Sequence, residues 1–206
     1  MPAKTAKLMP RITERKLAFE FPDDWQVVAY DRQADSTTDT PASFYRRVVE
    51  RGGVQQVCGM DIVCRLPSVP ESLQFIEVKD DRKREMAAGP RHTELFRVVM
   101  QKTAGTLAGL LLAERLQEEG MLPYACLSKE PAIEVVLFLV EPDLVPELPQ
   151  AAASTENNLY RLARKERVSG LDQRLTAKLA EWGLPFRLHD LDKRQPALWT
   201  VRNLQP

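Results

Sequence analysis

Two stretches, Gly59-Met60-Asp61-Ile62-Val63-Cys64 and Leu73-Gln74-Phe75-Ile76-Glu77-Val78-Lys79-Asp80, decide the fold, and a turn with prolines joins them. Both are apolar runs of strand length, so they predict two adjacent β-strands. Asp61, Glu77 and Lys79 are charges that a buried strand would ordinarily avoid. Side chains alternate between the two faces of a strand, so Glu77 and Lys79 point to the same face. If the two strands form a hairpin, the Asp61 carboxylate can converge with them.

Two carboxylates beside one ammonium suggest a metal site. Carboxylates that reach one point form an oxygen-rich pocket that suits Mg²⁺, which keeps several waters and often also binds a substrate phosphate. A metal in such a pocket can activate water and stabilise the charge of a phosphoryl transition state. The competing interpretation is an amphipathic hairpin whose charges are solvated, since many sheets have one polar face. That interpretation predicts polar residues at several alternate positions, whereas the flanks Ile62-Val63-Cys64 and Phe75-Ile76 are apolar.

An Asp on one strand followed by Glu-x-Lys on the next resembles the signature of the PD-(D/E)xK nuclease superfamily, which has the restriction-endonuclease-like fold. The matching residues are Asp61 and Glu77-Val78-Lys79, 16 positions apart, and Met60 stands where the motif has its Pro. The resemblance covers about residues 11–140. It implies an endonuclease that needs Mg²⁺ or Mn²⁺ and hydrolyses the phosphodiesters of nucleic acid, with DNA as the favoured substrate. It also implies in-line attack by water, usually leaving a 5′-phosphate.

The resemblance also assigns catalytic roles. Asp61 and Glu77 would hold the metal together with the Val78 carbonyl, and Lys79 would orient or activate the attacking water. In this fold the helix that follows the Glu-x-Lys strand places early polar residues near the active site. Gln101 is the candidate for such a role.

A further acidic ligand often comes from a helix that precedes the sheet in the resembled superfamily. The mixture of apolar and charged residues at 11–21 is consistent with a short helix. Its Glu14 and Glu20 are the candidates for the extra metal ligand. An ordinary solvated glutamate is an equally good interpretation of either.

Basic residues near the predicted site are candidates for phosphate contacts, because Lys and Arg provide most of the affinity for a nucleic-acid backbone. The densest basic cluster is the charged loop that follows Asp80. The alternative is that these side chains are merely solvated. Lys+Arg and Asp+Glu are both 29, a balance that argues against indiscriminate coating of nucleic acid but leaves room for a local basic channel. The candidates are Arg46, Arg47, Arg82, Lys83, Arg84 and Arg91.

Other elements follow from apolar periodicity and from turn residues. Strands are predicted at residues 25–31 and 132–140, a loop at 32–41 and a long helix from Thr93 to about Glu119. Gly105 and Gly109 in that helix would allow its backbone to approach the sheet closely. Residues 43–50 fit a short helix or a strand, and the sequence does not decide between them.

Prolines at positions 142, 146 and 149 mark a boundary between a nuclease core, residues 1–142, and a C-terminal extension packed on it, residues 143–206. The extension is expected to contain helices at 155–168 and 171–182, capped by Ser154 and Ser169, and strands at 185–189 and 197–202 that extend the sheet. The predicted fold class is therefore α/β, a restriction-endonuclease-like core with a central mixed sheet flanked by helices, plus an α/β extension.

The composition, with 44% apolar and 28% charged residues, is that of an ordinary soluble globular protein. Three cysteines without metal-binding spacing predict reduced thiols and a cytoplasmic location. Because the chain has only two histidines, metal chemistry is expected to use carboxylates. No signal peptide is apparent, and the longest apolar run, residues 103–113, is too short to cross a bilayer, so no membrane association is expected.

Two other functions stay open. The same fold without activity would serve as a nucleic-acid-binding or protein-interaction subunit of a defence or repair complex, which the zero net charge favours. A plain structural domain with an accidental motif would hold the Asp61 and Glu77 carboxylates too far apart to share an ion. A homodimer is also open, because many members of the resembled superfamily cut duplexes as dimers.

Overall fold

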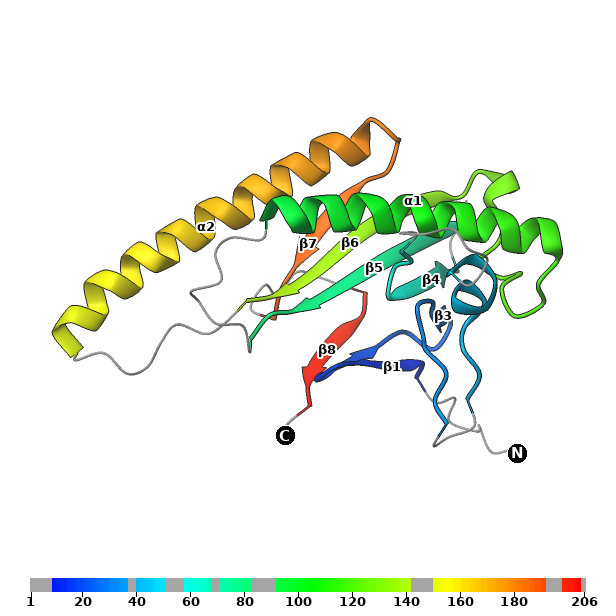
Figure 1. The fold of residues 1–206 in the computed structure, drawn as a ribbon, viewed down its shortest axis with the longest axis horizontal. Coiled ribbons are helices and arrows are strands. Elements are labelled where there is room, and N and C mark those ends of the chain that lie inside the picture. The colour runs from blue at the N-terminus through cyan, green and yellow to red at the C-terminus, as the bar shows by residue number, and fades with distance from the viewer. Residues whose placement is uncertain are drawn as a thin grey trace, which may run out of the picture.

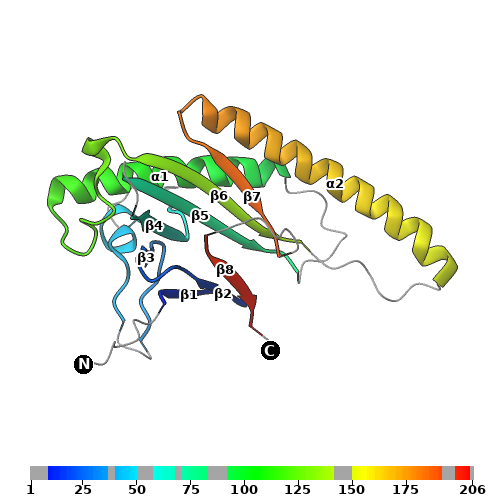
Figure 2. The ribbon, with the colours of Figure 1, turned by 180° about the vertical axis from the view of Figure 1, so that it is seen from behind.

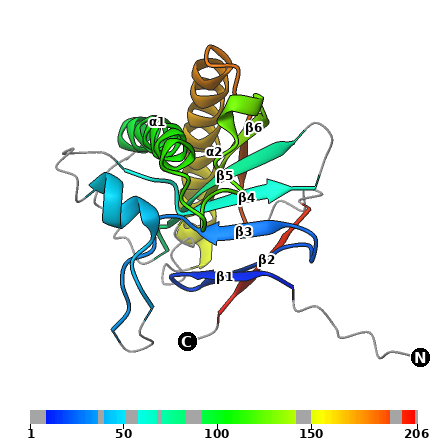
Figure 3. The same cartoon turned by 90° about the vertical axis from the view of Figure 1, so that its right-hand side faces the viewer.

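A five-stranded sheet, with strand order β3-β4-β5-β6-β7, forms the centre of the computed structural model, and a three-stranded sheet, β1-β2-β8, lies against it. The structure describes residues 9–36, 40–50, 58–67, 71–82, 92–141, 150–191 and 198–204. Two long helices, α1 (His92–Leu116) and α2 (Gln150–Ala180), cover one face of the larger sheet, and the smaller sheet covers the other face (Figures 1 and 3). The fold is mixed α/β, as predicted.

The larger sheet begins as an antiparallel meander and continues with parallel strands. Its strands are β3 (Gln26–Ala29), β4 (Ile62–Leu66), β5 (Ser72–Asp80), β6 (Ala132–Val140) and β7 (Phe186–His189). The predicted hairpin is confirmed, because β4 and β5 are antiparallel and Ile62 pairs with Ile76. Strand β6 is confirmed at both ends and runs parallel to β5, with α1 as the connection. Strand β7 extends this sheet, as predicted for the C-terminal region.

The N-terminal helix predicted for residues 11–21 is wrong. The chain forms a hairpin of β1 (Arg11–Glu14) and β2 (Leu17–Glu20), and Arg15 takes the left-handed conformation (φ 54°) in its turn. Leu17, Phe19 and Phe21 recur at every second position and are fully buried, which is the period of a strand and not of a helix. Strand β8 (Thr200–Asn203) pairs with β2, so the last predicted strand joins the smaller sheet and does not extend the larger one.

The helices differ from the prediction in two places. Helix α2 runs through Ser169 and Gly170 without a break, so the two helices predicted for residues 155–168 and 171–182 are one. A glycine costs about 1 kcal/mol relative to alanine inside a helix, and the adjoining stripe of Leu171, Leu175 and Leu179, buried against α1 and β7, offsets it. Residues Tyr45–Glu50 form a single helical turn of the π type, which settles the open choice for that segment.

The central sheet is buried on both faces, and each face belongs to a different hydrophobic core. One core lies between the sheet and the helices and includes Phe75, Val99 and Leu137. The other lies between the two sheets and includes Ile76 and Trp199. Because side chains alternate along β5, Glu77 lies on the same face as Phe75, under the helices. This alternation places the Glu77 side chain of the sequence motif beneath α1.

Helix α1 is also the part of the described structure whose length and apolar composition, over Thr93–Leu116, match those of a membrane span. Core helices of soluble proteins share these properties. In this fold the helix lies along the larger sheet (Figure 2), with Val99, Leu110 and Ala113 buried in the core. The residue after it, Gln117, has a φ of 53°, and the helix ends there.

At Gly109 the helix α1 closely approaches the side chains of Tyr30, which follows β3, and Val49. A Cβ added there would lie 2.2 Å from the Tyr30 hydroxyl oxygen but 3.5 Å from its Cζ and from Val49 Cγ2. Tyr30 is 1% exposed, and its hydroxyl has no hydrogen-bond partner among the described residues. The hydroxyl oxygen is thus the single atom that forbids a side chain at Gly109.

We therefore predict that Gly109→Ala destabilises the protein by about 3 kcal/mol, as an overpacked core does. In a Tyr30→Phe background the same change is expected to be neutral or to stabilise by up to about 1 kcal/mol, because alanine is the better helix former. Urea unfolding of the two single variants and the double variant measures this coupling. Equal effects of Gly109→Ala in both backgrounds would contradict it.

Candidate active site

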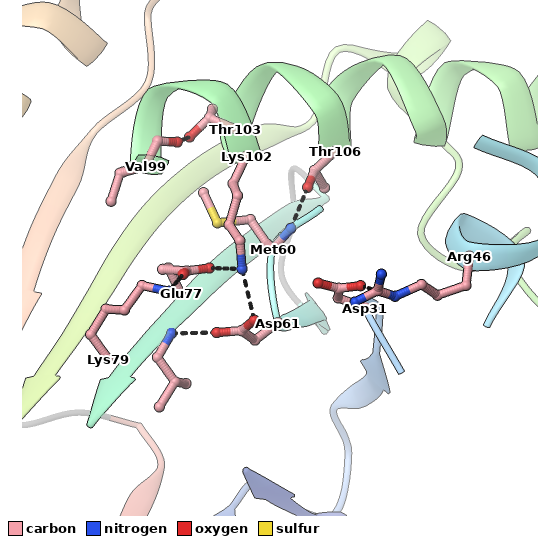
Figure 4. Close-up of polar contacts among 11 residues, drawn as sticks. Asp31, Arg46, Met60, Asp61, Glu77, Lys79, Val99, Lys102, Thr103 and Thr106 are labelled. Atoms are coloured by element: carbon pink, nitrogen blue, oxygen red, sulfur yellow. Dashed lines mark hydrogen bonds and ion pairs between the residues drawn. The ribbon is translucent and has the colours of Figure 1, made fainter. Parts of the chain in front are cut away.

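The β4–β5 hairpin brings Asp61 and Glu77 together on the face covered by α1 (Figure 4). Asp61 directly precedes β4, and its Oδ2 accepts a hydrogen bond of 2.7 Å from the Val78 backbone N–H. The Met60 backbone N–H donates to Thr106 Oγ1 on α1 at 2.9 Å. Both contacts fix the backbone and side chain of Asp61 against its neighbours, so the carboxylate has a defined position.

Lys102 of α1 bridges the two carboxylates. Its Nζ lies 2.9 Å from Asp61 Oδ1 and 2.7 Å from Glu77 Oε2 (Figure 4). These two oxygens share one neighbour, so they lie no more than 5.6 Å apart, the sum of the two distances. A separation beyond about 8 Å would exclude a shared ion or ion pair, and the two oxygens lie within that limit. Lys102 is 8% exposed.

The residue expected to reach the site from α1 was Gln101, and the structure places its neighbour there instead. Gln101 is half-buried and lies near Arg97, with Nη1 of the arginine 3.5 Å from Oε1. Adjacent helix positions differ by roughly 100° around the axis, so only one of the two can face the sheet. Lys102 falls into the buried helical stripe that contains Val99 and Thr106. A lysine inside an apolar helical stripe is the signal that identifies it.

Glu77 is fully buried between two ammonium groups. Lys79, whose side chain is 21% exposed, places Nζ 2.6 Å from Glu77 Oε1, while Lys102 approaches Oε2. Neither oxygen accepts an aligned hydrogen bond from the described residues. The carboxylate is therefore compensated mainly by the charge of the two ammonium groups. The structure thus brings together Asp61, Glu77 and Lys79 of the sequence motif and adds Lys102.

Burial and neighbouring charges shift the ionisation of this cluster. Burial raises the pKa of Glu77 to about 7, and the negative charge of Asp61 adds to the effect, while both lysines oppose it. Burial by itself lowers the pKa of Lys102, but the charges of Glu77 and Asp61 outweigh it and the pKa is raised overall. Lys102 therefore stays an ammonium, whereas Glu77 changes its charge near neutral pH.

A polar cavity of about 670 Å³ lies beside Asp61. Strand β1, the edge of β3 and the residues after β3 form its walls. Asp61 is the member of the cluster that lines the cavity, so it connects the cavity to the buried Glu77. Carboxylates and guanidinium groups both face it. The charged lining residues are Arg11, Glu14, Asp31, Arg32, Arg46 and Asp61.

The two glutamates proposed as extra ligands have different positions. Glu14 lines the cavity, and burial, followed by the charge of Asp61, raises its pKa. Glu20 pairs with Arg202 at 2.6 Å and does not line the cavity, so it is not part of this site. Within the described ranges, no three acidic, Cys or His side chains are grouped closely enough to hold a metal.

The basic residues predicted to contact phosphate lie in different parts of the structure. Arg46 lines the cavity and pairs with Asp31 at 2.5 Å. Arg47 turns toward the end of α1 and pairs with Glu118 at 2.9 Å. Arg82 binds Asp80 and Asn203 outside the cavity. The remaining candidates lie outside the described residues: Lys83, Arg84 and Arg91.

Arg11 and Arg32 line the cavity although the sequence did not single them out. They are far from the motif along the chain, and the pairing of strands brings them close to it. Arg11 is exposed on β1, and Arg32 donates to the Pro41 carbonyl at 3.2 Å. Both extend the positive charge that Arg46 begins.

The donor set fits a small divalent cation. Mg²⁺ in proteins commonly uses one or two carboxylates and completes its octahedron with water and substrate phosphate. Asp61 Oδ1 and Glu77 Oε2 already converge on one cationic nitrogen, and the buried Glu77 oxygens lack aligned hydrogen bonds. An ion at that place would take the position of Lys102 Nζ.

The raised pKa of Glu77 gives a stability prediction for the metal-free protein. Between the ordinary value of 4.5 and about 7 the folded state binds more protons than the unfolded state, so stability falls as pH rises through this window. Glu77→Gln removes this dependence. Its unfolding free energy relative to wild type should increase from about pH 5 to about pH 8, by up to about 3 kcal/mol. Chemical denaturation in chelator-containing buffer measures it, and a constant difference would contradict it.

Comparison of the chain with protein-family models, with curated proteins and with solved structures gives no match. What the site can do therefore follows from its own residues.

Proposed function

We propose that this chain is a Mg²⁺- or Mn²⁺-dependent nuclease of the PD-(D/E)xK type that hydrolyses phosphodiesters of nucleic acid, with DNA as the favoured substrate. The observation that carries the proposal is the convergence of Asp61 and Glu77 on one cationic position, with Lys79 beside them. The cavity next to Asp61 offers space, and the arginines among its lining residues can contact a phosphodiester.

The order of elements supports a restriction-endonuclease-like core as part of this proposal. Strands β3, β4 and β5 form an antiparallel meander, and α1 then leads to β6, which is parallel to β5. The resemblance implies the same order of elements: a strand, a pair of strands, a long helix and a further strand. The β1–β2 hairpin stands where the resembled superfamily has a helix.

Each residue of the cluster has a role in this mechanism. A divalent cation held by Asp61 and Glu77 would supply Lewis-acid stabilisation of the charge that develops on the phosphoryl oxygens. The Val78 N–H holds Asp61 in a fixed orientation, so the carboxylate is pre-organised. Lys79, more exposed than Lys102, donates to the attacking water and orients it toward phosphorus. Arginines around the cavity bind the flanking phosphates.

A second candidate is a nucleic-acid-binding or protein-interaction subunit without activity. Lys79 and Lys102 already neutralise the two carboxylates, so the cluster is electrostatically balanced without a metal. Such a cluster could serve only to tie α1 to the hairpin. Activity and metal binding separate the two candidates.

We predict that the purified protein cleaves plasmid, linear or single-stranded nucleic acid only when Mn²⁺ or Mg²⁺ is added. Asp61→Asn, Glu77→Gln and Lys79→Ala should each reduce the rate by about 100-fold or more, as expected when transition-state stabilisation is removed. Gel assays with DNA and RNA measure the rate. Arg47→Ala, which lies away from the cavity, is the control and should cleave like wild type. Variants as active as wild type would refute the proposed site.

Nucleic-acid binding is expected to depend on the arginines that line the cavity. Arg11→Ala is expected to weaken nucleic-acid binding and to lower the slope of log affinity against log salt by about 1, since one phosphate contact is lost. Fluorescence anisotropy without divalent metal measures affinity apart from cleavage. Arg47→Ala is again the matched control, because its guanidinium pairs with Glu118. Equal effects of both variants would show that the cavity is not the phosphate-binding surface.

A further inference from the structure

The cluster contains one more charged group than a nuclease motif of Asp, Glu and Lys requires. Lys102 comes from α1 and contacts both metal-holding carboxylates, at 2.9 Å from Asp61 and 2.7 Å from Glu77. Its side chain is 11% exposed. The ammonium thus occupies a position from which a cation reaches an oxygen of each carboxylate.

We propose that Lys102 is a built-in counter-ion that competes with the divalent metal for Asp61 and Glu77, so that metal binding requires the Lys102 ammonium to leave. This regulation of the site rests on the proposed function. Mg²⁺ binds oxygen at about 2.0 to 2.1 Å, so an ion shared by Asp61 and Glu77 would overlap with Lys102 Nζ. Two cations in one poorly solvated place also repel each other strongly.

The contacts of Glu77 are of a kind that permits such an exchange. Both Glu77 oxygens are buried and lie near ammonium groups, but neither accepts an aligned hydrogen bond within the described part of the chain. The attraction is therefore mainly one of charge, which another cation can supply. Asp61 keeps its hydrogen bond from the Val78 N–H on the other oxygen, so it does not depend on Lys102 for its orientation.

Lys79 provides a natural comparison. It contacts Glu77 through the opposite oxygen, Oε1, and no contact joins it to Asp61 in the described structure. Its side chain is 21% exposed, compared with 11% for Lys102. A metal between the carboxylates leaves room for Lys79 but not for Lys102. The two lysines carry the same charge, so a comparison of their variants tests the effect of position.

The test measures Mn²⁺ affinity by titration calorimetry without nucleic acid, for wild type, Lys102→Met and Lys79→Met. We expect Lys102→Met to bind Mn²⁺ at least about tenfold more tightly than wild type, because the competing charge is gone. Lys79→Met should tighten Mn²⁺ binding less than Lys102→Met does, because it removes a nearby positive charge but leaves the Lys102 ammonium in the shared position. Lys102→Gln, uncharged and of similar length, should behave like Lys102→Met. It replaces Lys102→Met in the test if the methionine variant does not fold.

The outcomes separate this inference from the proposed function. If wild type binds Mn²⁺ and neither Lys102 variant binds it more tightly, the competition is refuted while the metal site stands. If wild type and all variants fail to bind, the metal site and the inference both fall. In wild type, the Lys102 Nζ signal in ¹⁵N NMR should move and exchange faster with water when Mg²⁺ is added. A signal that stays protected with Mg²⁺ bound would overturn the inference without any substitution.

Discussion

The contact between Lys102 and the Asp61–Glu77 pair is the interaction on which the arrangement of this molecule depends. It joins the longest apolar helix to the central hairpin at a point where the core would otherwise hold uncompensated charge. Removing one partner of a buried ion pair commonly costs about 3 to 5 kcal/mol, because the remaining charge loses its compensation. A cation near the two carboxylates therefore lets the core keep them ionised.

The features that the sequence alone could predict depend on contacts between residues that are close along the chain. Alternation along β5 correctly put Glu77 and Lys79 on one face, and the short turn between two apolar runs gave the hairpin that brings Asp61 to them. Strand β6 was equally clear, because its apolar run is long and bounded by prolines. Each of these inferences needs only neighbours along the chain or a single hairpin. The α/β class then followed from the order of elements.

What the sequence could not give was mostly long-range. Lys102 reaches Asp61 across 41 positions of the chain, and only the docking of α1 decides that it, and not Gln101, faces the sheet. The hairpin at residues 11–20 is a different kind of miss. Its two-residue period is present in Leu17, Phe19 and Phe21, but the mixture of apolar and charged residues at 11–21 also fits a short helix. The sequence predicts a helix cap at Ser169, and tertiary burial of the neighbouring leucines overrides that local preference.

The position of the cavity follows from how the two sheets are stacked. Aromatic and aliphatic side chains fill most of the space between the sheets, including Phe19, Phe138 and Trp199. A polar group on this face, Gln74, is held by hydrogen bonds with Trp199 and Glu134. At one margin the edge strand β3 of the larger sheet meets the edge strand β1 of the smaller one, and the polar cavity forms between them. Asp61 lies at this margin and Glu77 lies just inside the core. A charged substrate can therefore approach the cluster from the margin without crossing either hydrophobic core, and the deeper carboxylate is kept away from bulk water, where its interaction with a cation would be weakest.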